Sequence, residues 1–303
     1  MRLVSFTHRN RQITAGVIND DDMVIDLSHA ACLKACSALR DLDHPHLDVF
    51  LAQGLERWLP LLATLTTLEE AALPLDQVHL HAPIPRPGKI MGAAYNFRDA
   101  LAERGMDLPS TPVVFFRAGN TAIGPGDAIL VPPDVGPVGY EAELAVVIGK
   151  PALKVDRAQA MRHVAGYVAH NDVSGSGLIR SDQGAFVRGK NLPASAPLGP
   201  WLLSGDALPD PYAVRLKLDI DGRPLQDGYC RDMVFDIADL IHSISQTIPL
   251  YPGDIIATGT PAGTAGAHTP AAWLCPGQTV TVDAGPLGIL RNPVAAGAAF
   301  LDN

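Results

Sequence analysis

Two glutamates spaced two residues apart give this chain its clearest chemical signal. Glu141 and Glu143 stand at the head of an apolar run that ends at Gly149 and is rich in valine and alanine. Such a run is typical of a buried strand, in which residues two apart point to the same face. Like charges side by side cost free energy unless a cation neutralises them, and carboxylate oxygens suit Mg²⁺, Mn²⁺ and Ca²⁺. The pair indicates a divalent-cation site; the alternative is an ordinary ion pair between one glutamate and an arginine or lysine.

The elements that must position this pair are mostly short strands. The chain has 28 glycines and 26 prolines, which favour many strands and turns over a helical bundle. Strands are expected at residues 3–6, 12–18, 23–27, 89–92, 113–117, 141–148, 164–173, 214–220, 254–258 and 279–282. Helical patterns occupy residues 28–40, 46–72, 97–104 and 236–247, the last with an apolar stripe that indicates core packing. Asp221-Gly222, between two strand-like runs, predicts a hairpin.

A proline-rich segment at residues 82–88 predicts the main domain boundary. Residues 1–82 are expected to form a small N-terminal α+β domain, and residues 83–303 a larger domain built mainly of strands. The predicted fold class is therefore mixed α/β and mainly β.

Composition excludes several classes of function. The formal net charge is -9 at pH 7 and no cluster of lysine and arginine is visible, which argues against a nucleic-acid partner. No apolar stretch reaches the length of a membrane span, and the N-terminus does not resemble a signal peptide, so a cytoplasmic protein without a membrane partner is expected. The scattered cysteines are interpreted as reduced structural thiols: Cys32, Cys36, Cys230 and Cys275.

A series of short motifs follows in a fixed order along residues 84–294. The motifs are Lys89-Ile90, Tyr140-Glu141-Ala142-Glu143-Leu144, Asn171-Asp172-Val173-Ser174, Arg188-Gly189-Lys190, Pro197-Leu198-Gly199-Pro200, Asp221-Gly222, Pro252-Gly253-Asp254 and Ala257-Thr258-Gly259-Thr260-Pro261-Ala262-Gly263. In this order they resemble the fumarylacetoacetate hydrolase family, and the N-terminal unit resembles the small leading domain of its longer members.

The resemblance implies a mixed β-sandwich roll, a homodimer, and a bound Mg²⁺ or Mn²⁺, with Ca²⁺ as a further choice for an all-oxygen site. It implies a small-molecule 2-oxo acid or 1,3-diketo acid substrate, and hydrolysis of a carbon–carbon bond, decarboxylation, dehydration or isomerisation as the reaction. The implied metal ligands are Glu141, Glu143 and Asp172. Lys190 is implied as the cation beside the site, and the implied substrate contacts are Thr260, Gly259, Gln226 and Arg117, the last standing where the family commonly has lysine.

The chain departs from the family at the usual general base. Family hydrolases carry Gly-x-Asn-Tyr-x-x-His-x-x-Glu, in which the histidine takes a proton from the attacking water. In residues 94–103 of this chain Asn96 and Glu103 match, but Phe97 and Ala100 occupy the tyrosine and histidine positions, and residues 82–162 contain no histidine. Alanine cannot titrate, so the usual base is absent. The Arg-Asp pair common after the Asn-Asp motif is also replaced, by Ser176-Gly177.

Three hypotheses follow from this pattern. The first, placed slightly ahead, is an acylpyruvate or diketo-acid hydrolase with a replacement base. One candidate for that base is His170, since it lies two residues before Asp172 in an expected strand; the alternative is a packed or hydrogen-bonded core histidine. The second is a lyase or keto–enol isomerase in which Glu103, Lys190 or a metal-binding carboxylate moves the proton. The third is a catalytically weak protein that binds a metal and a ligand.

Specificity for the far end of the substrate is expected from three segments, residues 94–112, 176–185 and 268–273. Four phenylalanines are candidates for an apolar wall, with ordinary core packing as the alternative: Phe97, Phe115, Phe116 and Phe186.

Overall fold

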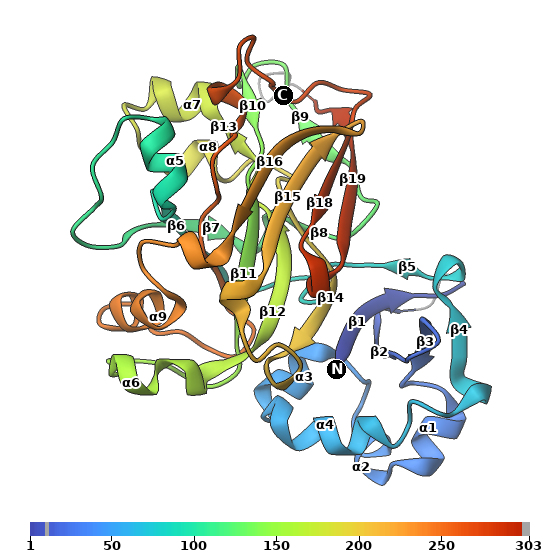
Figure 1. Ribbon diagram of the computed structural model, residues 1–303. Helices are drawn as coiled ribbons and strands as arrows, with labels where there is room; N and C mark the ends of the chain where they lie inside the picture. Colours follow the sequence, from blue (N-terminus) through green and yellow to red (C-terminus); the bar gives the residue numbers. More distant parts are fainter. Residues whose placement is uncertain (10–11, 299–303) are drawn as a thin grey trace.

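The computed structural model describes residues 1–9 and 12–298, and strands dominate its architecture (Figure 1). The largest sheet follows the order β4-β3-β2-β1-β14-β12-β11-β17-β6-β7, with β5 paired to β1 and β8 to β14. Its strands are β1 (Arg2–Thr7), β2 (Thr14–Ile18), β3 (Met23–Asp26), β4 (Ala72–Pro74), β5 (His79–Leu80), β6 (Lys89–Ala94), β7 (Val113–Ala118), β8 (Ala122–Ile123), β11 (Ala142–Ile148), β12 (Val164–Asn171), β14 (Ala196–Ser204) and β17 (Ile255–Ala257). The predicted mixed α/β, mainly β class is confirmed.

A second sheet packs against the first and encloses the larger core. Its order is β16-β15-β18-β19-β9, formed by β16 (Arg223–Tyr229), β15 (Arg215–Ile220), β18 (Thr279–Asp283), β19 (Ile289–Ala296) and β9 (Ile129–Val131). The predicted hairpin is present, because Ile220 pairs with Arg223 across Asp221 and Gly222, both of which have positive φ. A short pair, β10 (Val138–Gly139) with β13 (Ser174–Gly175), lies beside the site described below.

The central strand β11 is buried on both faces, which explains its continuous apolar sequence. Leu144 and Val146 belong to the core between the two sheets, whereas Ala145 and Val147 belong to a second core beneath the N-terminal helices. β11 pairs with β12 on one side and β17 on the other, both antiparallel. Because β11 is fixed by two neighbouring strands and by a core on each face, the residues at its start have a fixed position.

The helices are short and lie on the outside of the sheets (Figure 1). They are α1 (Ala30–Ala35), α2 (Ser37–Arg40), α3 (Leu47–Ala52), α4 (Leu55–Ala63), α5 (Arg98–Glu103), α6 (Arg157–Ala160), α7 (Ser176–Ser181), α8 (Phe186–Gly189) and α9 (Ile237–Ser245). The helix predicted at 236–247 is α9, whose stripe is buried as expected. The continuous helices predicted at 28–40 and 46–72 are wrong: the first breaks at the extended Cys36, and the second at Gly54, with φ of +90°.

The N-terminal segment is joined to the rest by strand pairing. β1 pairs with β14, so the N-terminal strands extend the same sheet that carries β11 and β12. Helices α1 to α4 lie below strands β1 to β3 in the view of Figure 1, where both groups are coloured blue. The domain boundary expected at residues 82 and 83 stays a prediction. Among the described residues, no helix is long and apolar enough to cross a membrane.

Candidate active site

Three carboxylates converge where β11 begins and β12 ends. The β11–β12 register places Ala142 opposite Asn171, so Glu141 and Asp172 flank the last pair of the ladder. Their backbones are joined, since the Asp172 amide donates to the Glu141 carbonyl at 2.9 Å. One oxygen from each of Glu141, Glu143 and Asp172 lies within 4.8 Å of the others. The spacing of Glu141 and Glu143 therefore does place two carboxylates together, although the strand itself starts at Ala142.

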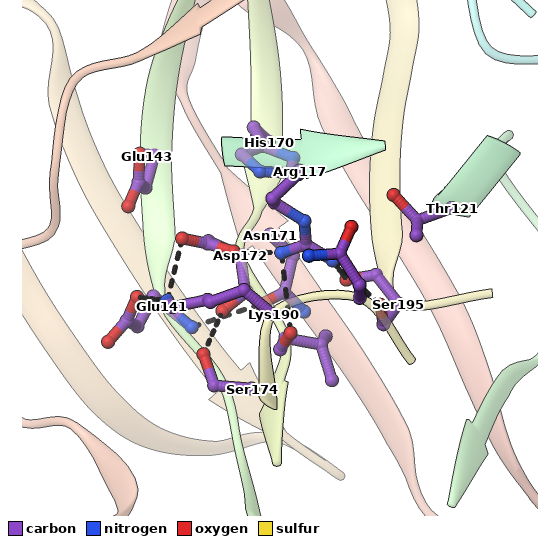
Figure 2. Close-up of polar contacts among 12 residues, drawn as sticks. Arg117, Thr121, Glu141, Glu143, His170, Asn171, Asp172, Ser174, Lys190 and Ser195 are labelled. Atoms are coloured by element: carbon purple, nitrogen blue, oxygen red, sulfur yellow. Dashed lines mark hydrogen bonds and ion pairs between the residues drawn. The ribbon is translucent and has the colours of Figure 1, made fainter. Parts of the chain in front are cut away.

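Two cationic side chains hold Asp172 from different sides (Figure 2). The Lys190 ammonium, just after α8, donates to Glu141 at 2.6 Å and to Asp172 at 2.7 Å. The Arg117 guanidinium, on β7, donates to the other Asp172 oxygen and to the Ser195 hydroxyl and carbonyl at 2.7 and 2.6 Å. Arg117 and Asp172 are both fully buried. Asp172 is thus fixed by charge-assisted hydrogen bonds before any ligand arrives.

The cluster carries one more negative charge than positive charges if all five groups are ionised. Burial, and next the charge of Glu141, raises the pKa of Glu143 to about 8. Burial lowers the pKa of Lys190, and the charge of Glu141 opposes that shift. A buried carboxylate whose ionisation is this costly fits a divalent cation, since the cation would favour the charged form and an all-oxygen set suits Mg²⁺ or Mn²⁺. Glu141, Glu143 and Asp172 are the residues that would hold it.

A cavity of about 640 Å³ opens over this cluster. Glu141, Glu143 and Lys190 line it, while Asp172 lies behind them. The three segments expected to set specificity all contribute walls: Tyr95 and Arg104, Ser176 and Arg180, and Trp273. Phe115 and Phe186 form part of the wall with ring centroids 5.0 Å apart, whereas Phe97 is in the core and Phe116 faces outward. The apolar-wall hypothesis therefore applies to two of the four phenylalanines.

The turn after β17 closes one side of the site. Gly259 adopts a φ of +95°, and its amide donates to Glu143 at 2.9 Å. A Cβ there would lie 3.0 Å from the Ala93 carbonyl oxygen, so the turn requires glycine both for conformation and for space. Asn96 braces the same turn by donating to the Thr258 carbonyl at 2.8 Å. Asn96 therefore has a structural role in this site.

Gly259 and Thr260 both line the cavity. The Thr260 hydroxyl donates to the Ala142 carbonyl and accepts from Gln226, each at 2.9 Å, so its hydrogen is already used within the protein. Gln226 is buried and also bonds the Ala142 amide and the Pro261 carbonyl, each at 2.9 Å. The sequence-based assignment of Gln226 to direct substrate contact has no support in this geometry. Instead, the Gln226 side chain joins the turn to β11 by hydrogen bonds.

Arg117 and His170 likewise lie behind the cavity wall. Neither side chain is exposed, and neither lines the cavity. His170 Nδ1 lies 2.8 Å from the Pro197 carbonyl, and burial, followed by the charge of Arg117, lowers the pKa of His170 to about 3. The expectation that Arg117 contacts substrate and His170 acts as replacement base is not supported, because neighbouring strands enclose both.

Glu103, by contrast, reaches the cavity. It is exposed, it lines the wall, and both of its carboxylate oxygens accept from the Gly263 amide at 3.2 Å. Ala100, one helical turn earlier on α5, also lines the cavity. Among the described residues that line the cavity there is no histidine.

Sequence reasoning did not single out Asn171 or Ser195 for the site. The Asn171 side chain accepts from the Glu141 amide at 3.0 Å, and Ser195 accepts from Arg117 at 2.7 Å. Asn171 belongs to the same sequence motif as Asp172, and this position next to Asp172 is the sequence signal that could have identified it. Nothing in the sequence around Ser195 marks it, because its role arises only from the packing of β7 against the segment before β14.

Comparison with known proteins identifies a family to which this chain is similar. A family model described as the C-terminal part of fumarylacetoacetate (FAA) hydrolase matches residues 89–295. The human mitochondrial oxaloacetate tautomerase FAHD2A is 34% identical over 246 residues, covering 81% of this chain and 78% of that protein.

Two solved structures extend the likeness to the N-terminal segment. The probable 2-hydroxyhepta-2,4-diene-1,7-dioate isomerase of Mycobacterium abscessus is 32% identical, with a TM-score of 0.79, covering 98% of this chain and 99% of that one. The maleylpyruvate hydrolase of a Sphingobium strain is 27% identical, also with a TM-score of 0.79, covering 98% of this chain and 100% of that one. Similar folds thus carry names of isomerases, tautomerases and hydrolases.

Proposed function

The chain is an enzyme of the fumarylacetoacetate hydrolase family, and from that premise we propose that it isomerises 2-oxo acids by moving a proton at the carbon next to the keto group. The observation that carries this proposal is the convergence of Glu141, Glu143, Asp172 and Lys190 beside a cavity that has no lining histidine among the described residues. Carboxylates and a lysine suffice to bind a 2-oxo acid and move a proton, whereas hydrolysis also needs an activated water.

The ligand set supports a metal-assisted reaction. A divalent cation bound by Glu141, Glu143 and Asp172 would supply a Lewis acid for the carboxylate and keto oxygens of the substrate. Lys190 keeps a positive charge at Glu141 and Asp172, which lowers the repulsion that three carboxylates exert on an acidic substrate. Arg117 and the Gly259 amide hold Asp172 and Glu143 in place, so little reorganisation is needed when substrate binds.

Glu103 is the proposed proton carrier. Its carboxylate is fixed by the Gly263 amide, faces the cavity, and is exposed enough to exchange protons with water. It lies on a different element from the metal-ligand cluster, so it can act on a substrate from another side. In this assignment Glu103 removes a proton from the carbon next to the keto group and delivers it to the keto oxygen, so that the C–H bond is broken, an O–H bond is formed and the keto form becomes the enol.

Hydrolysis of an acylpyruvate is the second candidate, and Glu103 is the observation that favours it. The same exposed carboxylate could accept a proton from an attacking water. His170 is not needed for this route. The two candidates therefore share every residue assignment and differ only in whether water attacks the carbonyl.

A mass balance of products separates the two candidates. The Mn²⁺-loaded enzyme is incubated with an acylpyruvate and with oxaloacetate, each with an EDTA control, and the products are followed by NMR. Metal-dependent interconversion of keto and enol forms without cleavage is the expected result. Release of pyruvate and a carboxylic acid at the rate of substrate loss would establish hydrolysis instead, and the Glu103→Gln variant should abolish whichever reaction is found.

A further inference from the structure

The backbone of Gly263 attaches the proposed proton carrier to the rest of the protein. Its amide donates to both carboxylate oxygens of Glu103 at 3.2 Å. Its carbonyl oxygen meets two donors, the Tyr140 hydroxyl at 3.4 Å and the Nε2 atom of His268 at 2.9 Å. The first distance is long for a hydroxyl donor, so His268 makes the stronger contact. Hydrogen bonds on both sides of its α-carbon therefore fix Gly263.

Gly263 needs these contacts because it has no side chain to fix its backbone. Its φ is +90°, and a Cβ there would lie 2.1 Å from the Leu225 carbonyl oxygen, so the turn excludes a side chain. Glycine also has a wider choice of backbone conformations than any other residue. The direction of the Gly263 amide, and with it the position of Glu103, therefore depends on what holds the Gly263 carbonyl.

The same turn is attached to α5 by two further contacts. Asp99 accepts from the Ala262 amide, and Arg104 donates to the Thr264 hydroxyl, each at 3.1 Å. These contacts lie on either side of the glycine and hold the helix as a whole, whereas the contact to Glu103 directs a single carboxylate. A change at the glycine carbonyl should therefore alter the position of Glu103 without releasing α5.

His268 reaches the Gly263 carbonyl from behind the cavity wall. It is half-buried and does not line the cavity, although Trp273, five residues later, does. Because a carbonyl oxygen can only accept, Nε2 carries the imidazole hydrogen in this contact. The simpler explanation is a histidine that only closes a loop, and it predicts that substitution lowers stability alone. A role in positioning Glu103 predicts that turnover falls as well.

We propose that His268 is a positioning residue for proton transfer: by holding the Gly263 carbonyl, it keeps the Gly263 amide directed at Glu103 and so fixes that carboxylate at the cavity. This inference rests on the proposed function, which makes Glu103 the proton carrier. In this assignment His268 contacts neither the substrate nor the carboxylate cluster. Its substitution should therefore lower the rate of proton transfer and leave the binding of metal and substrate intact.

Two amide substitutions test whether the donor at Nε2 is what matters. Glutamine can place its amide nitrogen close to the position of the imidazole Nε2 atom, whereas asparagine is one methylene group shorter and cannot reach it. The Mn²⁺-loaded enzyme is assayed for exchange of the C3 hydrogens of 2-oxohexanoate in heavy water, over a range of substrate concentrations that gives kcat and KM. His268→Asn should lower kcat about tenfold, the change expected for one lost hydrogen bond, while KM and the Mn²⁺ dissociation constant stay within about twofold of the wild type. His268→Gln should keep a kcat close to that of the wild type.

The matched control is His44→Asn. His44 is also half-buried, and its Nε2 atom lies 3.1 Å from a backbone carbonyl, that of Ile13, away from the cavity. The variant therefore loses the same kind of hydrogen bond without any contact to the turn at Gly263. Its kcat should equal that of the wild type.

A second measurement does not depend on turnover. Exchange of the Gly263 amide hydrogen in heavy water is followed by ¹H–¹⁵N NMR in the substrate-free enzyme. In His268→Asn this amide should exchange about tenfold faster than in the wild type, because its contact with Glu103 opens more often. In His268→Gln and His44→Asn its exchange should be unchanged.

The outcomes distinguish this inference from the proposed function. An unchanged kcat or an unchanged Gly263 amide in His268→Asn, or a loss that is equal in His268→Gln, overturns the positioning role and leaves the proposed function standing. A similar loss of kcat in His44→Asn, or weakened Mn²⁺ binding in His268→Asn, overturns it too, because the damage is then general. Absence of Mn²⁺-dependent exchange by the wild type overturns the proposed function and the positioning role with it. Loss of kcat and of amide protection in His268→Asn, with both kept in His268→Gln, supports both.

Discussion

The Asp172 side chain is fixed in position by several hydrogen bonds. Lys190 and Arg117 donate to different oxygens of its carboxylate, and its own amide bonds the backbone of Glu141. Each of these contacts comes from a different part of the chain. A carboxylate held in this way can accept a cation with little loss of side-chain freedom, which is the condition for tight binding.

The first prediction concerns the proposed metal ligands. Glu141→Gln and Asp172→Asn should each lower Mn²⁺ affinity by at least tenfold, because each removes one charged oxygen ligand. Titration calorimetry measures the affinity, and circular dichroism should show that both variants keep the native fold. Unchanged affinity in both variants would contradict the assignment of the cluster as a metal site.

The second prediction concerns His170. His170→Ala should lower the free energy of unfolding by about 3 kcal/mol, since it leaves a buried cavity and an unpaired Pro197 carbonyl. His170→Asn, which can still donate to Pro197, should lose less. Urea titration measures both. The turnover of folded His170→Asn should stay close to that of the wild type; a fall of about a hundredfold or more, as expected for loss of a general base, would restore His170 as a catalytic candidate.

A third prediction is the pH dependence of metal stabilisation. The pKa of Glu143 is raised from 4.5 to about 8 in the folded, metal-free protein, so that form loses stability as the pH rises across this range. A bound cation removes the penalty because it favours the ionised carboxylate. The increase in melting temperature caused by Mn²⁺ should therefore grow from pH 5 to pH 8, and should vary less in Glu143→Gln. A shift that is largest at pH 5 would be inconsistent with this account.

At the level of single residues, the sequence predicted which side chains lie together only where their spacing along the chain determines it. Glu141 and Glu143 are two apart, so their proximity follows from strand periodicity. Asp172 was assigned only through the family resemblance, because its nearness depends on the β11–β12 register. Whether a side chain faces a cavity or the strands behind it is not encoded in spacing, which is why Arg117, Gln226 and His170 were assigned to chemistry that their burial does not support.

Among the elements, the turn that begins at Gly259 is the most closely coupled to the site. Its amide holds Glu143, and Asn96 braces it from the start of the segment that leads into α5. The turn therefore links Glu143 to the helix that carries Glu103.

The fourth prediction tests this coupling. Gly259→Ala should weaken Mn²⁺ binding by about tenfold, because a Cβ at this φ is strained and displaces the amide that holds Glu143. Gly222→Ala is the matched control: its φ of +80° imposes similar strain, but open space surrounds the added Cβ and the hairpin lies outside the site. Calorimetry should find normal Mn²⁺ affinity in Gly222→Ala. Equal losses in the two variants would show that strain, and not the Glu143 contact, is responsible.

Element-level prediction from sequence depended on how local the determinants are. The helix α9 was predicted because its apolar stripe is local, and the structure adds an equally local capping box at Asp236. The strand β14 was not predicted, since its prolines disfavour a strand and only pairing with β1 and β12 establishes it. The break at Gly54 was missed because helical periodicity continues on both sides of it.

For the molecule as a whole, the site lies where two cores share one strand. The core between the sheets and the core under the N-terminal helices meet along β11. Loss of packing in either core should therefore disturb the carboxylate cluster. The homodimer implied by the family resemblance stays a prediction, as does the identity of the metal.

A fifth prediction uses the cysteines to probe this packing. Cys32, Cys36 and Cys230 are buried and Cys275 is exposed, and none is in a disulfide. Burial also raises the pKa of Cys32 to about 11, so the thiol of Cys32 stays protonated at pH 8. Ellman's reagent should therefore modify one thiol quickly in the native protein and all four after unfolding in guanidinium. Fast modification of two or more thiols in the native state would show that a core is more open than described.

The central claim is that the carboxylate cluster supports proton movement at the carbon next to the keto group of a 2-oxo acid. The most direct measurement follows exchange of the hydrogens at C3 of 2-oxoadipate and 2-oxohexanoate for deuterium by NMR, in heavy water with Mn²⁺. The wild-type enzyme should speed this exchange without cleaving the substrate, while EDTA-treated enzyme and Asp172→Asn at the same total Mn²⁺ should not exceed the rate of Mn²⁺ alone. Exchange that is no faster with the wild type than with Asp172→Asn would contradict the claim.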